Sequence, residues 1–288
     1  MYLAGTMLCI FALRTGCHQR AWTKYGNIRP RTVGREGLRH SYSFDERIGM
    51  HTKITPYVES RLIESNCRFE LAVATLRSPE FGNNSVVSVS DEGYGAMMCT
   101  EVGDSKHSGL FASAAAYAGL CAIDRGLGAR DALKSASDAS RNVNVHIAQR
   151  CGGASGCAIT LIQNGIEWAV SGNIGVFLAY GGKVRMLSTP AEAYGDSLTS
   201  YLGQASLGAT PIDSGYVSIP QPDGVFAVAT DAISEQLGKS NISDGFAEAG
   251  DLESMAVSIL RKLIDWGLEK EASILLARPI FDEIVSGE

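Results

Sequence analysis

The sequence predicts an α/β (α+β) fold in which antiparallel sheets carry helices on their outer faces. Strand-like segments follow one another in groups with turn residues between them, and the helical segments come in blocks. Such grouping favours antiparallel sheets with helices outside over a parallel sheet built from βαβ units. With 288 residues, 45% of them hydrophobic, and 32 Gly against 8 Pro, the chain has the composition of one main folded domain with many tight turns.

The first strand group lies between residues 69 and 101. FELAVATL, NSVVSVSD and GAMMCTE are rich in β-branched or apolar residues, and Gly, Asn and Asp separate them. We therefore expect strands at 69–76, 84–91 and 95–101.

Two helices are expected to follow these strands. Apolar residues recur every three or four positions from Leu110 to Cys121, which predicts a helix over 108–125. The more polar segment 132–149 is expected to form the second helix.

A glycine-rich segment, CGGASGC, separates the helices from the next strand group. It predicts a turn, because it lacks the Lys-Ser/Thr ending and the following helix of a phosphate-binding loop. Asn164-Gly165 and Gly181-Gly182 are hairpin signals between apolar segments. An antiparallel meander is therefore expected, with strands at 158–163, 167–172, 175–180 and 183–188.

The last third of the chain begins with a polar stretch at 190–214. Apolar segments at 216–220 and 224–231 predict two strands, and a one-sided apolar pattern predicts a helix over 252–266. The segment 272–280 is expected to form the closing strand.

Residues 1–49 differ from the rest in charge. They hold eight Lys/Arg against three Asp/Glu, a net charge of +5, which leaves −11 for the remainder of the −6 chain. They show no helical or strand period, so we expect a weakly ordered basic extension before a folded domain at 50–288. Two interpretations stay open: an organelle transit segment, which would imply import, or an extension upstream of a natural start at Met50.

The charge and cysteine patterns exclude several classes of partner. The acidic body has no cluster of Lys/Arg, so no nucleic-acid partner is expected, and no apolar run approaches the roughly 20 residues of a membrane span. Seven cysteines without a metal-binding spacing predict reduced thiols, in the cytoplasm or another reducing compartment. No protein partner can be named from the sequence.

Four segments carry a family resemblance. They are MCTEVGDSKHSGLFAS (98–113), WAVSGNIGVFL (168–178), VATDAISEQL (228–237) and KEASILLA (270–277). In this order they resemble the motifs VADGxGGHxxGExAS, WVANVGDSRAYL, LATDGLxE and DNATVVLV of the metal-dependent Ser/Thr protein phosphatases (PPM, type 2C). The resemblance covers about Leu71 to Pro279, and it implies a four-layer α-β-β-α sandwich with the active site at one end.

The chain departs from this family where the metals would bind. The resemblance places Glu101 at the metal-bridging Asp and retains Asp231, while Gly175 stands at a usual Arg. Five further positions of the former site are degenerate: Asn84, Val102, Asn173, Ala232 and Lys270.

A two-metal centre needs several carboxylates to hold two dications and offset their charge. Glu101 and Asp231 remain as residual metal positions, which is too few. We therefore expect a pseudophosphatase with no catalytic residues and no cofactor, acting by protein binding or regulation.

Two alternatives are kept. One is a divergent Ser/Thr phosphomonoester hydrolase that uses Mg or Mn at a reduced site. The other is a phospho-ligand binding module in which Arg77 and Lys270 contact the phosphate. Lys270 could also pair with Asp231 in place of a metal, whereas Asp231 could instead cap a helix and Glu101 could be a solvated strand-end carboxylate.

Overall fold

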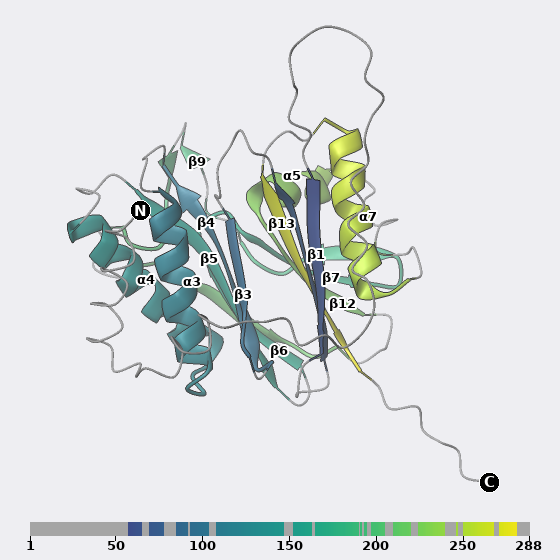
Figure 1. Ribbon diagram of the computed structural model, residues 1–288, viewed down its shortest axis with the longest axis horizontal. Helices are drawn as coiled ribbons and strands as arrows, with labels where there is room; N and C mark the ends of the chain where they lie inside the picture. Colours follow the sequence, from purple (N-terminus) through teal and green to yellow (C-terminus); the bar gives the residue numbers. More distant parts are fainter. Residues whose placement is uncertain are drawn as a thin grey trace, which may run out of the picture. The chain divides into compact units, whose positions relative to one another are not determined.

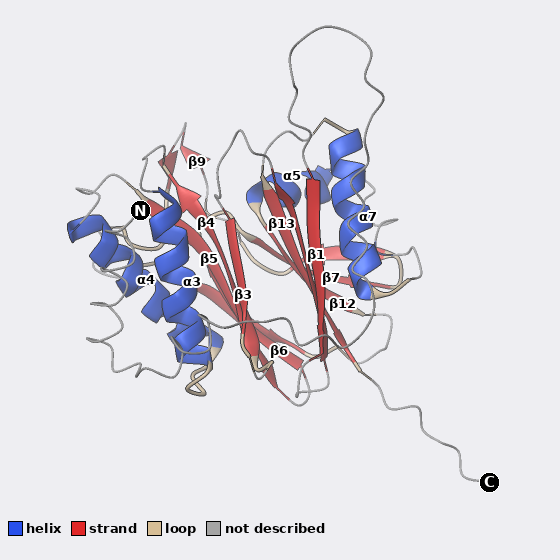
Figure 2. Ribbon diagram, viewed as in Figure 1, coloured by secondary structure: helices blue, strands red, loops and turns tan. Residues whose placement is uncertain are grey.

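Two antiparallel sheets, with helices on both outer sides, make up the part of the chain that the structure describes (Figures 1 and 2). This computed structural model describes residues 57–64, 69–77, 85–91, 93–103, 108–146, 152–162, 165–189, 191, 193–194, 197–204, 210–219, 224–239, 246, 250–267 and 271–280. The expected fold class, a four-layer α-β-β-α sandwich, is confirmed. The predicted extension at 1–49 lies outside the described residues, so the domain division stays a prediction.

The first sheet has six strands in the order β1-β2-β13-β12-β7-β8. All neighbours in it are antiparallel, and the closing strand of the chain lies in the middle of the sheet. The strands are β1 (Tyr57–Glu64), β2 (Phe69–Arg77), β13 (Ala272–Pro279), β12 (Val225–Ala229), β7 (Gly175–Tyr180) and β8 (Lys183–Met186).

The second sheet has five strands in the order β11-β6-β5-β4-β3. β5 and β6 form the antiparallel pair that the hairpin signal predicts, but the register pairs Ile162 with Gly165, so Gly165 is the first residue of β6 and not a turn residue. The strands are β11 (Asp213–Val217), β6 (Gly165–Ser171), β5 (Gly153–Ile162), β4 (Gly95–Val102) and β3 (Ser85–Val89). A small ribbon of β9 (Ala193–Tyr194) and β10 (Ser197–Leu198) stands apart from both sheets.

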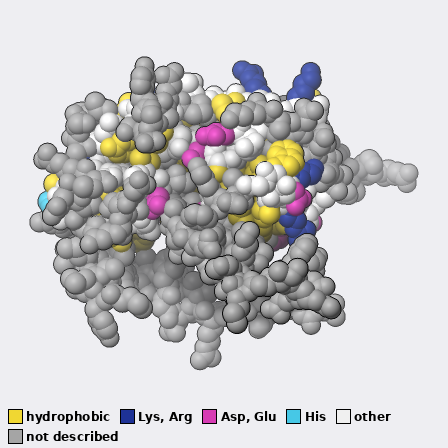
Figure 3. Space-filling model, turned by 90° about the horizontal axis from the view of Figure 1, so that it is seen from above, with side chains coloured by type: hydrophobic (Ala, Val, Ile, Leu, Met, Phe, Trp, Pro, Cys, Tyr) yellow, Lys and Arg dark blue, Asp and Glu magenta, His cyan; other side chains and the backbone are white. Residues whose placement is uncertain are grey.

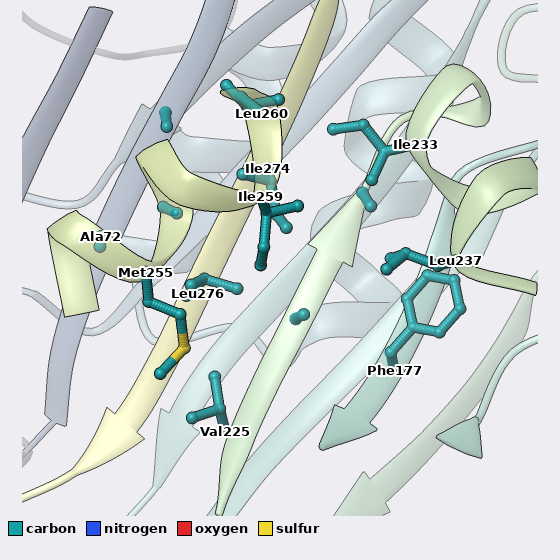
Figure 4. Close-up of a cluster of buried hydrophobic side chains, with 14 of the residues drawn as sticks. Ala72, Phe177, Val225, Ile233, Leu237, Met255, Ile259, Leu260, Ile274 and Leu276 are labelled. Atoms are coloured by element: carbon teal, nitrogen blue, oxygen red, sulfur yellow. The ribbon is translucent and has the colours of Figure 1, made fainter. Parts of the chain in front are cut away.

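The helices cover the outer faces of the two sheets. α3 (Ser108–Ile123) and α4 (Ala129–His146) bury apolar residues against the five-stranded sheet, and α5 (Asp231–Lys239) and α7 (Leu252–Asp265) do so against the six-stranded sheet. Figure 4 shows Leu237 of α5 beside Phe177, and Met255 and Ile259 of α7 over Ile274 and Leu276. A third buried cluster fills the space between the sheets. Among the described residues, no helix has both the length and the apolar composition needed to cross a bilayer.

The start of β5 predicted from the sequence was wrong. CGGASGC was expected to be a turn, but β5 begins at Gly153 and runs through this segment. The glycines serve close packing: a Cβ on Gly153 would lie 2.3 Å from the Tyr201 ring, and one on Gly156 would lie 2.4 Å from Leu202 Cδ1. β1 was also missed, and α4 begins one turn earlier than expected because the Gly128 carbonyl accepts its first backbone hydrogen bonds.

Two of the described cysteines, Cys99 and Cys157, are free thiols. Cys99 and Cys157 lie on neighbouring strands but face opposite sides of the sheet, since one packs under the helices and the other between the sheets. Burial raises the pKa of both thiols, so they remain protonated and unreactive.

Asp251 caps the N-terminus of α7, and its removal is expected to destabilise the domain. Its carboxylate accepts hydrogen bonds from Ser254 N and Ser254 Oγ, each at 2.7 Å, and these bonds lower its pKa. We expect Asp251→Ala to reduce the free energy of unfolding by about 1 kcal/mol at pH 7, measured by urea denaturation.

Because the folded-state pKa is the lower one, this contribution is present above the unfolded-state pKa of about 4 and disappears as the pH falls below it. Asp265→Ala, at the opposite end of α7, is the control and should cause no loss, since a carboxylate there opposes the helix dipole. Equal losses in the two variants would contradict the capping role.

Candidate functional site

Six buried hydroxyl residues form two rows at one end of the sandwich, one row on each sheet. On the six-stranded sheet Thr75 pairs with Ser273, whose other neighbour is Thr230. On the five-stranded sheet Ser85 pairs with Thr100, which pairs with Ser155. All six are at most 9% exposed. We call these residues the hydroxyl layer: Thr75, Ser85, Thr100, Ser155, Thr230 and Ser273.

The alternation of the strands directs the hydroxyl layer inward. Two residues earlier on β2, β12 and β4 stand Val73, Val228 and Met98, which belong to the apolar cluster between the sheets. Residues two apart on a strand share a face, so the hydroxyl layer continues this inter-sheet core at its end. The interior of the sandwich thus changes from apolar to polar within one layer.

Hydrogen bonds within the hydroxyl layer join the two sheets. Ser273 shares one bond with Thr75 Oγ1 at 2.9 Å and another with the Ser85 hydroxyl across the inter-sheet space. The Ser273 backbone N–H donates to Thr230 Oγ1 at 3.2 Å. These partners satisfy groups that would be costly to bury unpaired, and Ser273 is the centre of the arrangement.

Asn173, in the turn between β6 and β7, and Gly175, the first residue of β7, lie beside the hydroxyl layer. Ser155 Oγ donates to Asn173 Oδ1 at 2.7 Å, so the side chain that the resemblance places at an Asp of the former site already has a protein partner. Gly175 N donates to Ser234 Oγ at 3.1 Å, and a Cβ on Gly175 would lie 2.4 Å from that oxygen and 2.6 Å from the Phe177 ring. No larger side chain fits at position 175 without a shift of its neighbours.

Glu101 follows the hydroxyl layer on β4 but lies on the opposite face of the sheet. It pairs with Ala154 and comes two residues after Cys99, both of which pack against α3 and α4. By the same alternation Glu101 faces the helices, whereas Val102 has the inward orientation. The half-buried Glu101 therefore stands behind the sheet rather than between the sheets.

Asp231 is the first residue of α5 and is half-buried. The N-cap of this helix is Thr230, whose carbonyl accepts Ser234 N at 2.8 Å, so Asp231 is not the cap that was considered as one of its roles. A carboxylate in the first turn still interacts favourably with the helix dipole. Ala232, one residue further, packs against the cluster under the helices.

Arg77 ends β2 and is held by two carboxylates. It forms an ion pair with Glu271, its Nε lies 3.4 Å from Glu59 Oε2, and its Nη1 donates to the Ser85 carbonyl at 3.5 Å. The Glu271 side chain is only 2% exposed, so this pair is largely removed from water. Asn84 and Lys270, and with Lys270 the expected pair to Asp231, lie outside the described residues.

The structure thus brings the described site positions to one end of the sandwich but gives them different surroundings. Within the described ranges, no three His, Cys, Asp or Glu residues gather as metal ligands would. Figure 3 views the domain from above, where hydrophobic and acidic side chains lie close together and Lys/Arg side chains project near one edge. This face is not uniformly charged.

The hydroxyl layer was not predicted from the sequence. The predicted site residues were Glu101 and Asp231, each of which directly follows a member of the layer. A usable signal was present, because Thr100, Thr230 and Ser273 continue the inward-facing apolar positions of their strands. Thr or Ser at the end of such a row predicts a polar termination of the core.

The fold is that of the metal-dependent Ser/Thr phosphatases (PPM, type 2C). Solved structures that share it include PppA, a key regulatory component of T6SS in Pseudomonas aeruginosa, with 11% identity, a TM-score of 0.59, and coverage of 78% of this chain and 97% of that one. PstP/Ppp of Mycobacterium tuberculosis has 10% identity, a TM-score of 0.57, and coverage of 78% and 99%.

The serine/threonine phosphatase of S. agalactiae has 12% identity, a TM-score of 0.57, and coverage of 77% and 100%. PstP has also been solved in complex with 2 manganese ions. No family model and no curated protein matches the sequence. The likeness is therefore one of fold, over nearly the whole length of these phosphatase domains.

Ser273→Ala tests whether the hydroxyl layer stabilises the domain. The substitution leaves the Thr75 and Ser85 hydroxyls buried without this partner, so we expect a loss of about 1–3 kcal/mol in urea denaturation. Ser88→Ala on β3 is the control, and its effect should stay within about 0.5 kcal/mol. If both variants were equally stable, the bonds of Ser273 would not hold the sheets together.

Proposed function

We propose that this chain is a catalytically inactive phosphatase-like domain that acts by binding or regulating another protein. The observation that carries the proposal is the hydroxyl layer: its six inward-facing residues are neutral, and four of them, Thr75, Ser85, Thr230 and Ser273, bond to one another. Neutral hydroxyls that already have protein partners are poor candidates to hold a pair of dications. In this proposal the domain has the phosphatase fold but does not hydrolyse phosphate esters.

The side chains available to coordinate metal ions support this proposal. Two hard dications require several carboxylate oxygens, and of the positions that the family resemblance assigns to metals, Glu101 and Asp231 alone are acidic. Glu101 faces the helices, which leaves Asp231 as the better placed of the two. A lysine at position 270 would add an ammonium about 4 Å from a dication, a repulsion of about 8 kcal/mol at an effective dielectric of about 20. These residues do not fit a two-metal centre.

The surroundings of Arg77 also favour a structural role. Its guanidinium is engaged by Glu59 and Glu271, so a phosphate would have to compete with two carboxylates for it. The phospho-ligand module, with Arg77 and Lys270 as phosphate contacts, is therefore the weaker alternative. A thermal-shift screen with phosphate-bearing ligands addresses it, and a stabilising ligand lost in Lys270→Ala would favour that module over the inactive domain.

One observation favours a second candidate, a divergent phosphatase with a single metal. Asp231 is retained at the end of the sheet and is half-buried, and Mg²⁺ can be held by one or two carboxylates with water and substrate phosphate completing its shell. In that case Mg or Mn would be the cofactor. The two candidates differ in whether Asp231 supports turnover.

A phosphatase assay separates the two candidates. With p-nitrophenyl phosphate and excess Mn²⁺, we expect no turnover above that of the Asp231→Ala variant, because too few ligands remain to activate a water. The solved phosphatase PstP is a suitable positive control. Turnover that requires Asp231 would exclude the inactive domain and establish the single-metal enzyme.

Restoring a carboxylate should partly restore metal affinity. We expect Lys270→Asp to bind Mn²⁺ more tightly than the wild type in isothermal titration calorimetry, because it replaces a repulsive charge by a ligand. Lys134→Asp, an exposed position on α4, adds the same charge change elsewhere and should leave the affinity unaltered. An unchanged affinity in Lys270→Asp would remove position 270 from the former metal site.

A further inference from the structure

The segment 201–204 is fixed against the end of β5 by backbone pairing. Leu202 N donates to Ala154 O at 2.7 Å, and Ala154 N donates to Leu202 O at 3.1 Å. The Leu202 side chain is fully buried in the cluster under α3 and α4, where it fills the space that Gly156 leaves open. The segment thus reaches the interior although it belongs to neither sheet.

Polar side chains of α4 hold the same segment from the other side. Ser140 Oγ donates to Leu202 O at 3.2 Å, and Ser137 Oγ accepts from Gly203 N at 3.4 Å. Asn144 Nδ2 donates to Gly203 O at 3.0 Å and to Gly152 O at 2.7 Å. Gly203 has φ +81°, and a Cβ there would lie 2.5 Å from Ser140 Oγ. The helix and the segment are therefore in close contact.

Three buried polar atoms in this region have no hydrogen-bond partner among the residues that the structure describes: Arg141 Nε, Asn144 Oδ1 and Gln204 Oε1. Asn144 is 1% exposed, and its amide orientation is fixed because Nδ2 donates to two carbonyl oxygens. Arg141 precedes Asn144 by three residues and so lies on the same side of α4, and Gln204 follows the glycine whose carbonyl Asn144 holds, so the three side chains belong to one region of the fold.

We propose that an ordered water molecule is bound by these three atoms and links α4 to the segment 201–204. Arg141 Nε is a donor, and the oxygens of Asn144 and Gln204 are acceptors. A water molecule accepts one hydrogen bond and donates two, which satisfies all three, and buried waters typically make about three hydrogen bonds.

Other small ligands match this donor set less well. An anion would face the two amide oxygens, and a metal cation would face the guanidinium. The site therefore selects a neutral group with one acceptor and two donor hydrogens. The water completes the contact by which α4 positions the segment beside the candidate site.

Gln204→Met tests the bound water, because the direction of the change in stability differs with and without it. With the water in place the substitution removes one of its three partners, so the equilibrium constant for unfolding should rise several-fold in urea denaturation. If Gln204 Oε1 is instead an unpaired buried atom, its removal should leave stability unchanged or raise it, and either result would overturn the proposal. Arg141→Met should behave like Gln204→Met, whereas Arg130→Met, on the exposed first turn of α4, is the matched control and should have little effect.

A high-resolution crystal structure of the wild-type protein decides the matter even if these variants fail to fold. The expected result is a single water peak within hydrogen-bond distance of Arg141 Nε, Asn144 Oδ1 and Gln204 Oε1. A direct hydrogen bond from Arg141 Nε to either amide oxygen, an empty site, or density larger than one water molecule would contradict the proposal.

Discussion

The hydrogen bond between Ser85 and Ser273 is the contact on which the site end of this domain depends. It crosses from one sheet to the other, and through Ser273 it connects to Thr75 and Thr230 on the neighbouring strands. The Arg77–Glu271 ion pair, in which the glutamate is almost fully buried, lies at the same end. Side-chain hydrogen bonds and this ion pair therefore both join strands there.

The two polar assemblies of the domain share one physical rule, which is that buried polar atoms must find partners. In the hydroxyl layer the partners are protein groups: Ser273 bonds to Thr75, Ser85 and Thr230, and Ser155 bonds to Asn173. Around α4 and the segment 201–204 the backbone groups have side-chain partners, but Arg141 Nε, Asn144 Oδ1 and Gln204 Oε1 have none among the described residues. The second region is therefore the one in which we place a bound water molecule.

Much of the fold could be predicted from the sequence, because strand alternation and helical periodicity are local properties. The helix at α7, the strands β2, β4, β7 and β13, and the pairing of β5 with β6 follow from such patterns, although the turn between β5 and β6 lies one residue earlier than Asn164-Gly165. The start of β5 could not be predicted, since Gly153 and Gly156 are required by the approach of Tyr201 and Leu202 from some 50 residues away. For the candidate site, the identities at Glu101 and Asp231 were evident, but the face on which Glu101 lies depends on its register with Ala154.

Gly175 couples three positions of the domain to one another. A Cβ at this position would lie 2.4 Å from Ser234 Oγ and 2.6 Å from the Phe177 ring, and the Gly175 N–H already donates to that hydroxyl. A larger residue at 175 is therefore compatible only with a shift or a replacement at 177 or 234. The effect of any substitution here depends on its two neighbours, so measured changes in stability at 175, 177 and 234 should not be additive.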